Sequence, residues 1–225
     1  MNSALLMLVD GRFPAGGHTN SAGVEAAVRI GDVHDDATLE RYLLGRLATT
    51  GVVDAAFAAH VTALGDTLAE PDVSATVDAE LSARLASPAL RAASRRFGRQ
   101  LCRAASGVWT SPALDALVHH DRGAHQAVVL GAAVSAAGGT STDAAALAFH
   151  HLSAAVTSSG VRLLGLDPMT VAASQARVGL HVDAWLAQAA TWATSPVSDL
   201  PADGGSLTEI LAQDHAARDA RLFVA

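Results

Sequence analysis

The ten histidines are the side chains in this sequence best suited to bind a metal ion. His119, His120 and His125 lie close together in the chain, and His150 and His151 are adjacent. Neighbouring residues on a helix point about 100° apart, so each adjacent pair offers at most one ligand per face. No H-x-x-x-H or H-E-x-x-H pattern occurs, so no helix supplies two ligands one turn apart. A nickel or zinc site could still assemble from distant helices, but polar or capping histidines are the commoner outcome, and we assign no metal ligand.

A glycine-rich turn, FPAGGHTNSAGVE from Phe13 to Glu25, is the candidate for binding phosphate. Exposed amides after the Gly16-Gly17 pair could attract an anion at the start of a helix. The spacing matches neither the Walker loop nor the dinucleotide fingerprint, and no lysine follows. We therefore predict a tight turn between two packed helices, without a nucleotide or other cofactor.

A basic stripe is the third candidate. Arg91, Arg95, Arg99 and Arg103 recur at every fourth position, Arg84 and Arg96 lie nearby, and no acidic residue occurs between Glu80 and Asp115. On a helix this spacing predicts a spiral of guanidinium groups opposite the apolar face. Such a stripe is either a solvated face or a docking surface for an acidic partner, because arginine is favoured in interfaces.

Catalytic patterns are weak. The sequence has no G-x-S-x-G elbow, and Cys102 lies within an apolar helical pattern, where a thiol is usually inert. His181 and Asp183, together with scattered serines, do not make a triad. We therefore expect a protein that is not an enzyme.

The end of the chain is the last candidate. Leu207, Ile210 and Leu211 predict an apolar face on a short helix, and Leu222 and Phe223 follow near the terminus. Terminal apolar residues of this kind are either buried in their own core or available to a partner.

Helix signals recur along the whole chain, and strand alternation is hard to find. Capping residues precede prolines at Ser87-Pro88, Ser111-Pro112 and Asp167-Pro168, which predicts three helix starts. Glycines predict helix ends at Gly31, Gly51, Gly107 and Gly138-Gly139. We expect an all-α fold of about ten helices in a single domain over residues 1–225. Within it, residues 195–206 would be a flexible link and residues 207–225 a C-terminal docking segment.

Composition narrows the class of protein. A formal net charge of −7 argues against a nucleic-acid-binding protein. The longest weakly polar stretch noted, Ala127 to Gly139, is too short to span a membrane, and the N-terminus lacks the basic region of a signal peptide. The single cysteine is compatible with a reducing compartment. We therefore expect a cytoplasmic protein.

Three segments resemble signature segments of the UreF family of urease accessory proteins. The turn from Phe13 to Glu25 is similar to L-P-x-G-G-[FA]-x-x-S-x-G-[LI]-E, SRRFGRQLCRAA to S-x-x-x-G-R-x-L, and HAARDARLFVA to H-E-x-x-x-R-L-F. The matching residues are Pro14, Gly16, Gly17, Ser21, Gly23 and Glu25, then Ser94, Gly98, Arg99 and Leu101, then His215, Arg221, Leu222 and Phe223. The three motifs stand in the correct order across nearly the whole chain.

The resemblance implies an all-helical protein that usually forms a homodimer and has no catalytic activity of its own. Such proteins bind the accessory protein UreD (also called UreH) and the GTPase UreG, and the assembled complex delivers nickel to apo-urease. The alternative is a chaperone that binds nickel directly through its histidines.

Two hypotheses about partner binding follow from the resemblance. The C-terminal segment would become ordered on UreD, and the region from Pro14 to Glu25 would help to recruit UreG. The residues assigned to partner binding are Pro14, Gly16, Gly17, Ser21, Glu25, Arg99, His215, Arg221, Leu222 and Phe223.

Overall fold

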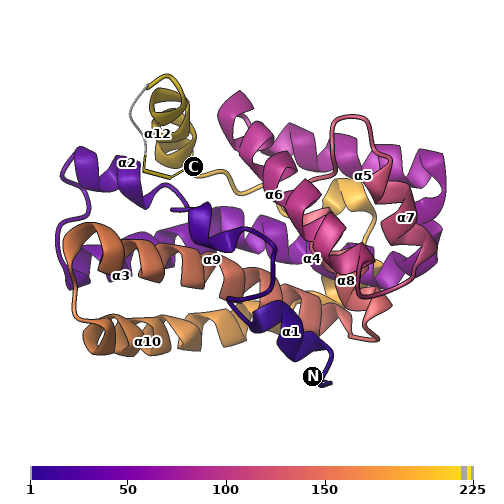
Figure 1. The fold of residues 1–225 in the computed structure, drawn as a ribbon, viewed down its shortest axis with the longest axis horizontal. Coiled ribbons are helices and arrows are strands. Elements are labelled where there is room, and N and C mark those ends of the chain that lie inside the picture. Colours follow the sequence, from indigo (N-terminus) through magenta and orange to yellow (C-terminus); the bar gives the residue numbers. More distant parts are fainter. Residues whose placement is uncertain (1, 219–221, 224–225) are drawn as a thin grey trace.

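The computed structural model describes residues 2–218 and 222–223, and every regular element in these residues is helical (Figure 1). The α-helices of the described chain are α1 (Leu5–Val9), α2 (Val24–Arg29), α3 (Asp36–Arg46), α4 (Val52–Leu64), α5 (Pro71–Arg84), α6 (Pro88–Ser106), α7 (Pro112–Val118), α8 (Gln126–Ala136), α9 (Ser141–Leu164), α10 (Pro168–Leu186), α11 (Ala189–Thr194) and α12 (Ser206–Ala216). Short 3₁₀ turns lie at Gly17–Thr19, Gly65–Ala69 and Val197–Asp199. The predicted all-α fold is confirmed.

The three predicted cap-and-proline starts open α6, α7 and α10. The Ser87 hydroxyl accepts a hydrogen bond from the Leu90 amide at 3.4 Å, and Asp167 accepts from the amides of Met169 and Thr170. Each cap therefore partners an amide that the first helical turn leaves free. Ser111 differs, because its hydroxyl hydrogen-bonds to Asp66 at 3.1 Å instead of capping α7.

The predicted helix end at Gly51 is wrong. Gly51 keeps helical dihedral angles and completes a π-turn, Leu47–Gly51, that joins α3 to α4 without a break. A side chain here would meet Leu152 of α9 at 3.1 Å. This glycine is therefore suited to the close approach of two helices rather than to ending one.

The helical stretch Asp36–Ala69 is long and apolar enough to cross a membrane by length and composition alone. It has 34 residues, a mean hydropathy of 1.4 in its most apolar window, and 67% of that window is buried inside the protein. This window of 18 residues holds at most two charged residues, so it is longer than Ala127 to Gly139, the longest stretch expected from the sequence. The core helix of a soluble protein meets the same criteria, so the stretch is weak support for a membrane span.

α4 is the central helix and contacts α8, α9 and α11 (Figure 1). Its middle is almost entirely small, with four buried alanines beside Phe57. α3 and α10 pack with α9 on one side of it, and α6 and α7 pack with α8 on the other. The buried apolar side chains of both groups belong to one continuous cluster. Small side chains let these helices approach closely, which keeps the core dense despite few aromatic residues.

Gly98 shows how tight this packing becomes. It lies in the middle of α6, where a Cβ would stand 2.0 Å from the carbonyl oxygen of Ala124. Because that oxygen belongs to the backbone, rotation of a side chain cannot relieve the overlap.

We predict that Gly98→Ala lowers the free energy of unfolding by about 2–3 kcal/mol, because the added methyl group overpacks the contact between α6 and the start of α8. Gly179→Ala is the matched control: Gly179 lies within α10 and has no neighbour within 4 Å of an added Cβ. That change should instead stabilise the protein by about 0.5–1 kcal/mol through helix propensity. Urea denaturation measures both values, and equal effects would contradict the packing argument.

Candidate functional site

The N-terminal turn packs against α6. Gly16 has a φ of 76°, which favours glycine, and a Cβ at this position would lie 2.0 Å from the Gln100 side-chain oxygen. Ser21 is fully buried, whereas Pro14 and Gly17 are exposed. Gly16 therefore serves a close contact between two of the three motifs, whereas Gly17 has no neighbour within 4 Å of an added Cβ and lies at the surface.

Glu25 joins the first motif to the third. Its carboxylate accepts hydrogen bonds from the backbone amides of Leu222 at 2.8 Å and Phe223 at 3.0 Å. The buried His215 ring places Nε2 3.7 Å from Glu25 Oε2 and 3.3 Å from the Phe223 carbonyl oxygen. We call these four residues the tail clasp. Arg221 lies outside the described residues.

The two apolar residues of the clasp have different environments. Phe223 is buried, and the guanidinium of Arg162 in α9 lies 4.5 Å from the centre of its ring, a cation–π geometry. Leu222 is 67% exposed. Phe223 is therefore covered by the protein's own residues, while its neighbour Leu222 faces outwards.

α12 divides its predicted apolar face in the same way. Leu211 is buried, but Leu207 and Ile210 are 53% and 66% exposed. Glu209 points inwards and accepts a hydrogen bond from the Ser87 amide at the start of α6. The helix is therefore attached to α6 and α2 on one side and presents two large apolar side chains on the other.

The segment between α11 and α12 has specific contacts with α5. The Arg84 guanidinium donates to the carbonyl oxygens of Ser198, Leu200 and Pro201 at 2.9–3.0 Å, and Leu200 is buried. The flexibility predicted for residues 195–206 stays a prediction.

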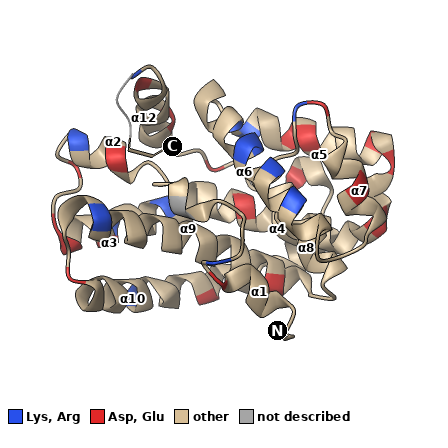
Figure 2. Ribbon diagram, viewed as in Figure 1, with Lys and Arg blue, Asp and Glu red and all other residues tan. Residues whose placement is uncertain are grey.

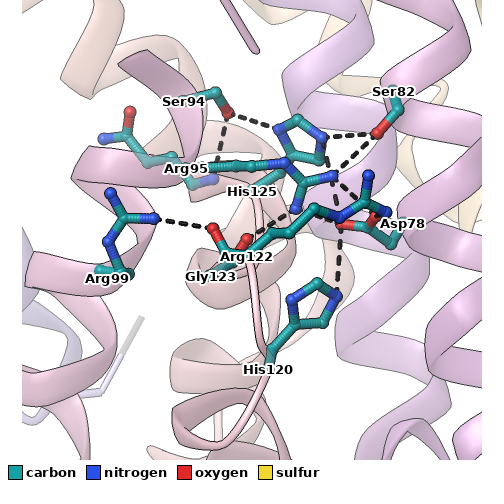
Figure 3. A network of polar contacts seen from close by, with 10 residues as sticks. Asp78, Ser82, Ser94, Arg95, Arg99, His120, Arg122, Gly123 and His125 are labelled. Atoms are coloured by element: carbon teal, nitrogen blue, oxygen red, sulfur yellow. Dashed lines mark hydrogen bonds and ion pairs between the residues drawn. The ribbon is translucent and has the colours of Figure 1, made fainter. Parts of the chain in front are cut away.

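The second motif holds the loop between α7 and α8 (Figure 3). Ser94 Oγ lies 3.0 Å from His125 Nδ1 and accepts a hydrogen bond from the backbone amide of Gln126 at 3.2 Å. Arg99 donates from Nη1 to the carbonyl oxygen of Arg122 at 2.7 Å. Together with the close contact at Gly98, these bonds attach residues 122–126 to one side of α6.

The predicted arginine spiral is wrong at Arg95, which is buried rather than exposed (Figure 3). Steps of four residues drift around a helix, and Arg95 falls on the inward face that also carries Gly98, Cys102 and Ala105. There it makes two hydrogen bonds with the carboxylate of Asp78 in α5, at 2.8 and 2.7 Å. Asp78 was missed in the sequence because a lone aspartate beside apolar residues carries no local sign of its partner.

Arg95 also joins the loop to the ion pair. Its guanidinium donates to the Gly123 carbonyl oxygen at 2.6 Å and to the Ser82 hydroxyl at 3.0 Å. Burial opposes the ionisation of Asp78, but the hydrogen bonds and charge of Arg95 outweigh it, so the pKa of Asp78 lies below its usual value. The pair is thus charged and has several hydrogen-bond partners, as a buried ion pair requires.

His125 is neutral at pH 7. Burial, followed by the nearby charge of Arg95, lowers its pKa to about 4. Ser82 Oγ lies 2.9 Å from its Nε2, a distance at which a histidine can activate a serine. His125 is fully buried, however, and its other ring nitrogen contacts Ser94. The arrangement therefore secures the loop and offers little access to a substrate.

The histidines do not converge on a metal-binding geometry in the part of the chain that the structure describes, where no group of three His, Cys, Asp or Glu side chains could hold an ion. His119 Nδ1 hydrogen-bonds to the Asp115 carbonyl oxygen at 2.8 Å, on the surface. His120 Nε2 lies 3.8 Å from Asp78. His120 and His125 thus meet at a carboxylate that Arg95 already occupies.

Fold and site together define an all-helical protein in which residues of the three motifs attach loops and residues 222–223 to the helical core. The family model for UreF matches residues 33–179. A urease accessory protein UreF from Mycolicibacterium vanbaalenii is 40% identical over 224 residues, covering 98% of this chain and 97% of that protein. Proteins of the same name from Mycobacterium sp. (strain JLS) and Mycobacterium tuberculosis (strain H37Rv) are 38% and 37% identical, over 98% and 99% of this chain and 97% and 98% of their own lengths. The chain belongs to the UreF family.

We predict that His125 makes the protein less stable as the pH falls from about 6.5 to 4. Its pKa is lower in the folded state, about 4, than the unfolded value of 6.5, so the unfolded chain binds the proton first. The loss should reach on the order of 2 kcal/mol by pH 5. Denaturation of wild type and His125→Gln across this range measures it. The variant should show a flatter profile, and the exposed His34→Gln is the control; identical profiles for wild type and His125→Gln would contradict the assignment.

We predict that Glu25→Gln loosens the chain end, because one amide oxygen cannot replace a carboxylate that accepts two backbone amides. Hydrogen exchange of the Leu222 and Phe223 amides should become at least about tenfold faster, corresponding to about 1.4 kcal/mol. Glu40→Gln, which removes a surface carboxylate paired with Arg177, is the control and should leave these amides unchanged. Equal exchange in wild type and Glu25→Gln would show that the clasp does not hold the tail.

Proposed function

We propose that this protein is a urease accessory protein that acts as a non-catalytic scaffold. It would bind UreD (UreH) and recruit or regulate the GTPase UreG, so that nickel is inserted into apo-urease. The observation that carries the proposal is the similarity to proteins named urease accessory protein UreF, which extends over 98–99% of the chain. It includes the segments that contain all three motifs.

The chemistry of the described residues supports a role without catalysis. His125 and Ser82 form the best candidate for a base and nucleophile, but the imidazole is fully buried. Cys102 is buried as well, and burial raises the pKa of its thiol, so the reactive thiolate is disfavoured. Contacts with other proteins are therefore the better-supported activity.

The outer side of α12 supports a docking role for the C-terminal segment. Leu207 and Ile210 are one turn apart on a helix, and both are more than half exposed, as is Leu222 beyond it. Full burial of an exposed side chain of this kind is favourable by roughly 1.5–3 kcal/mol, and covering the part of each side chain that is still exposed would contribute a fraction of that. We propose that UreD covers this apolar surface, while the tail clasp keeps the segment in place.

The exposed part of the N-terminal turn is the proposed contribution to UreG recruitment. Pro14 and Gly17 are exposed, whereas Glu25 is occupied by the tail clasp. Within this proposal the effect of changing Glu25 would be indirect, through the position of the chain end beside the turn.

The proposal includes a homodimer in the cytoplasm. α10 exposes Met169 and Leu180, at 77% and 74% of their surface. They lie three helical turns apart, so a second copy could cover both at once.

We predict that the purified chain captures UreD and UreG from the same organism, and that cells lacking it make inactive, nickel-poor urease. Leu207→Asp combined with Ile210→Asp should weaken UreD binding at least about tenfold, or about 1.4 kcal/mol, without loss of helicity by circular dichroism. Leu6→Asp combined with Met7→Asp, at two exposed apolar residues of α1, is the control with the same change in net charge. If neither partner binds and urease matures normally without the chain, the proposed function is wrong.

A further inference from the structure

A compact group of exposed arginines lies beside the loop that the second motif holds. Arg96, Arg99 and Arg103 are exposed on α6 at a spacing of three and four residues, which places them on one face. Arg122, from the loop between α7 and α8, is 75% exposed and adjoins Arg99. We call these four residues the α6 arginine surface; Figure 2 shows basic residues gathered along α6.

The charge of this surface is not balanced by neighbouring acidic side chains of the described chain. Several other arginines have acidic partners, as Arg12 has Asp10, Arg84 has Glu80 and Arg177 has Glu40, whereas the isolated Arg41 on α3 has none within ion-pair distance among the described residues. No acidic side chain of the described chain lies within ion-pair distance of Arg96, Arg99 or Arg103. Arg122 reaches Asp78 only at 3.8 Å, and Arg95 already neutralises that carboxylate.

The positive charge is local in an otherwise acidic chain. Residues 81–114 contain six arginines and no acidic residue, although the whole chain has a net charge of −7. Like charges repel, so an uncompensated cluster costs stability unless something else makes use of it. A solvated face would tolerate such a cluster, but it would not require the arginines to be held in place.

The contacts of the loop hold part of the surface in place. Arg99 donates to the Arg122 carbonyl oxygen, and the buried Arg95 donates to the next one, at Gly123. Gly123 has a φ of 74°, and the Arg99 side chain packs where its Cβ would be, 2.5 Å away. The buried ion pair thus sets the position of Arg122 relative to α6. A surface arranged in advance loses less conformational entropy on binding than free side chains would.

We propose that the α6 arginine surface docks acidic side chains of a protein partner in the accessory complex. The proposal rests on the proposed function, and it adds the surface and the chemistry of the contact. Guanidinium groups match carboxylates in a two-point geometry, and arginine is favoured in protein interfaces. A nucleic acid is the weaker candidate, because the overall negative charge of the chain would repel its phosphates along most of the surface.

The test is a double charge reversal, Arg96→Glu with Arg103→Glu, because neither side chain has a described hydrogen bond to lose. Arg41→Glu with Arg177→Glu is the charge-matched control, since both residues are exposed, neither lies in the segments proposed to bind UreD or UreG, and the change in net charge is identical. Binding of purified UreD and of purified UreG is measured separately at low and high salt, and circular dichroism checks the fold. If the charge-reversed variant misfolds, Arg96→Gln with Arg103→Gln is tested in its place.

We expect the reversal to weaken binding of one partner at least about tenfold at low salt and to reduce the salt dependence of the wild type, with the control within about twofold. Normal binding of both partners by the reversed variant, with normal urease activation, would overturn this inference and leave the proposed function intact. Failure of the wild type to bind either partner or to activate urease would overturn both. Two other outcomes would assign the surface to another occupant and refute the proposal. One is binding of single-stranded RNA by the wild type but not by the reversed variant; the other is a variant that loses self-association while it still binds both partners.

Discussion

α4 passes through the middle of the molecule with four buried alanines, and because these side chains are small, the surrounding helices must come close to it. The same requirement explains glycines within helices. A Cβ at Gly131 of α8 would stand 2.5 Å from the Ala58 carbonyl oxygen of α4, and one at Gly160 of α9 would meet Leu39 of α3 at 2.3 Å. A core of small side chains buries enough apolar surface only when its helices are in close contact. Such contacts tolerate few enlargements, which is why the effect of a glycine substitution depends so strongly on its site.

The polar interior has a different purpose. An ion pair such as Arg95 with Asp78 adds little net stability, because the desolvation of both charges offsets their attraction. The pair instead fixes geometry, because the guanidinium of Arg95 in α6 bonds both to α5 and to the loop before α8. A neutral His125 fits beside it without adding a charge. The network therefore fixes the position of the loop before α8, and with it the position of the exposed Arg122 relative to α6.

The three motifs that suggested partner binding prove to be in contact with the protein itself. Gly16 meets Gln100, Ser94 holds His125, and Glu25 holds the chain end. In this protein the motif residues therefore have mainly intramolecular contacts. The residues with the clearest pattern make the scaffold, and the adjacent exposed residues, such as Ile210 and Arg103, are the candidates for contact with other proteins.

The sequence alone determined the all-helical fold, the starts of α6, α7 and α10, and the family, because caps, prolines and motif spacing act over a few residues and can be read locally. It did not reveal that Gly51 continues a helix, that Arg95 is buried, or that Glu25 binds the amides of residues almost 200 positions away. These outcomes depend on which element lies opposite, and burial and charge pairing are properties of two surfaces in contact. The approach of α9 decided the first outcome, the ion pair between α5 and α6 the second, and the packing of α12 beside α2 the third.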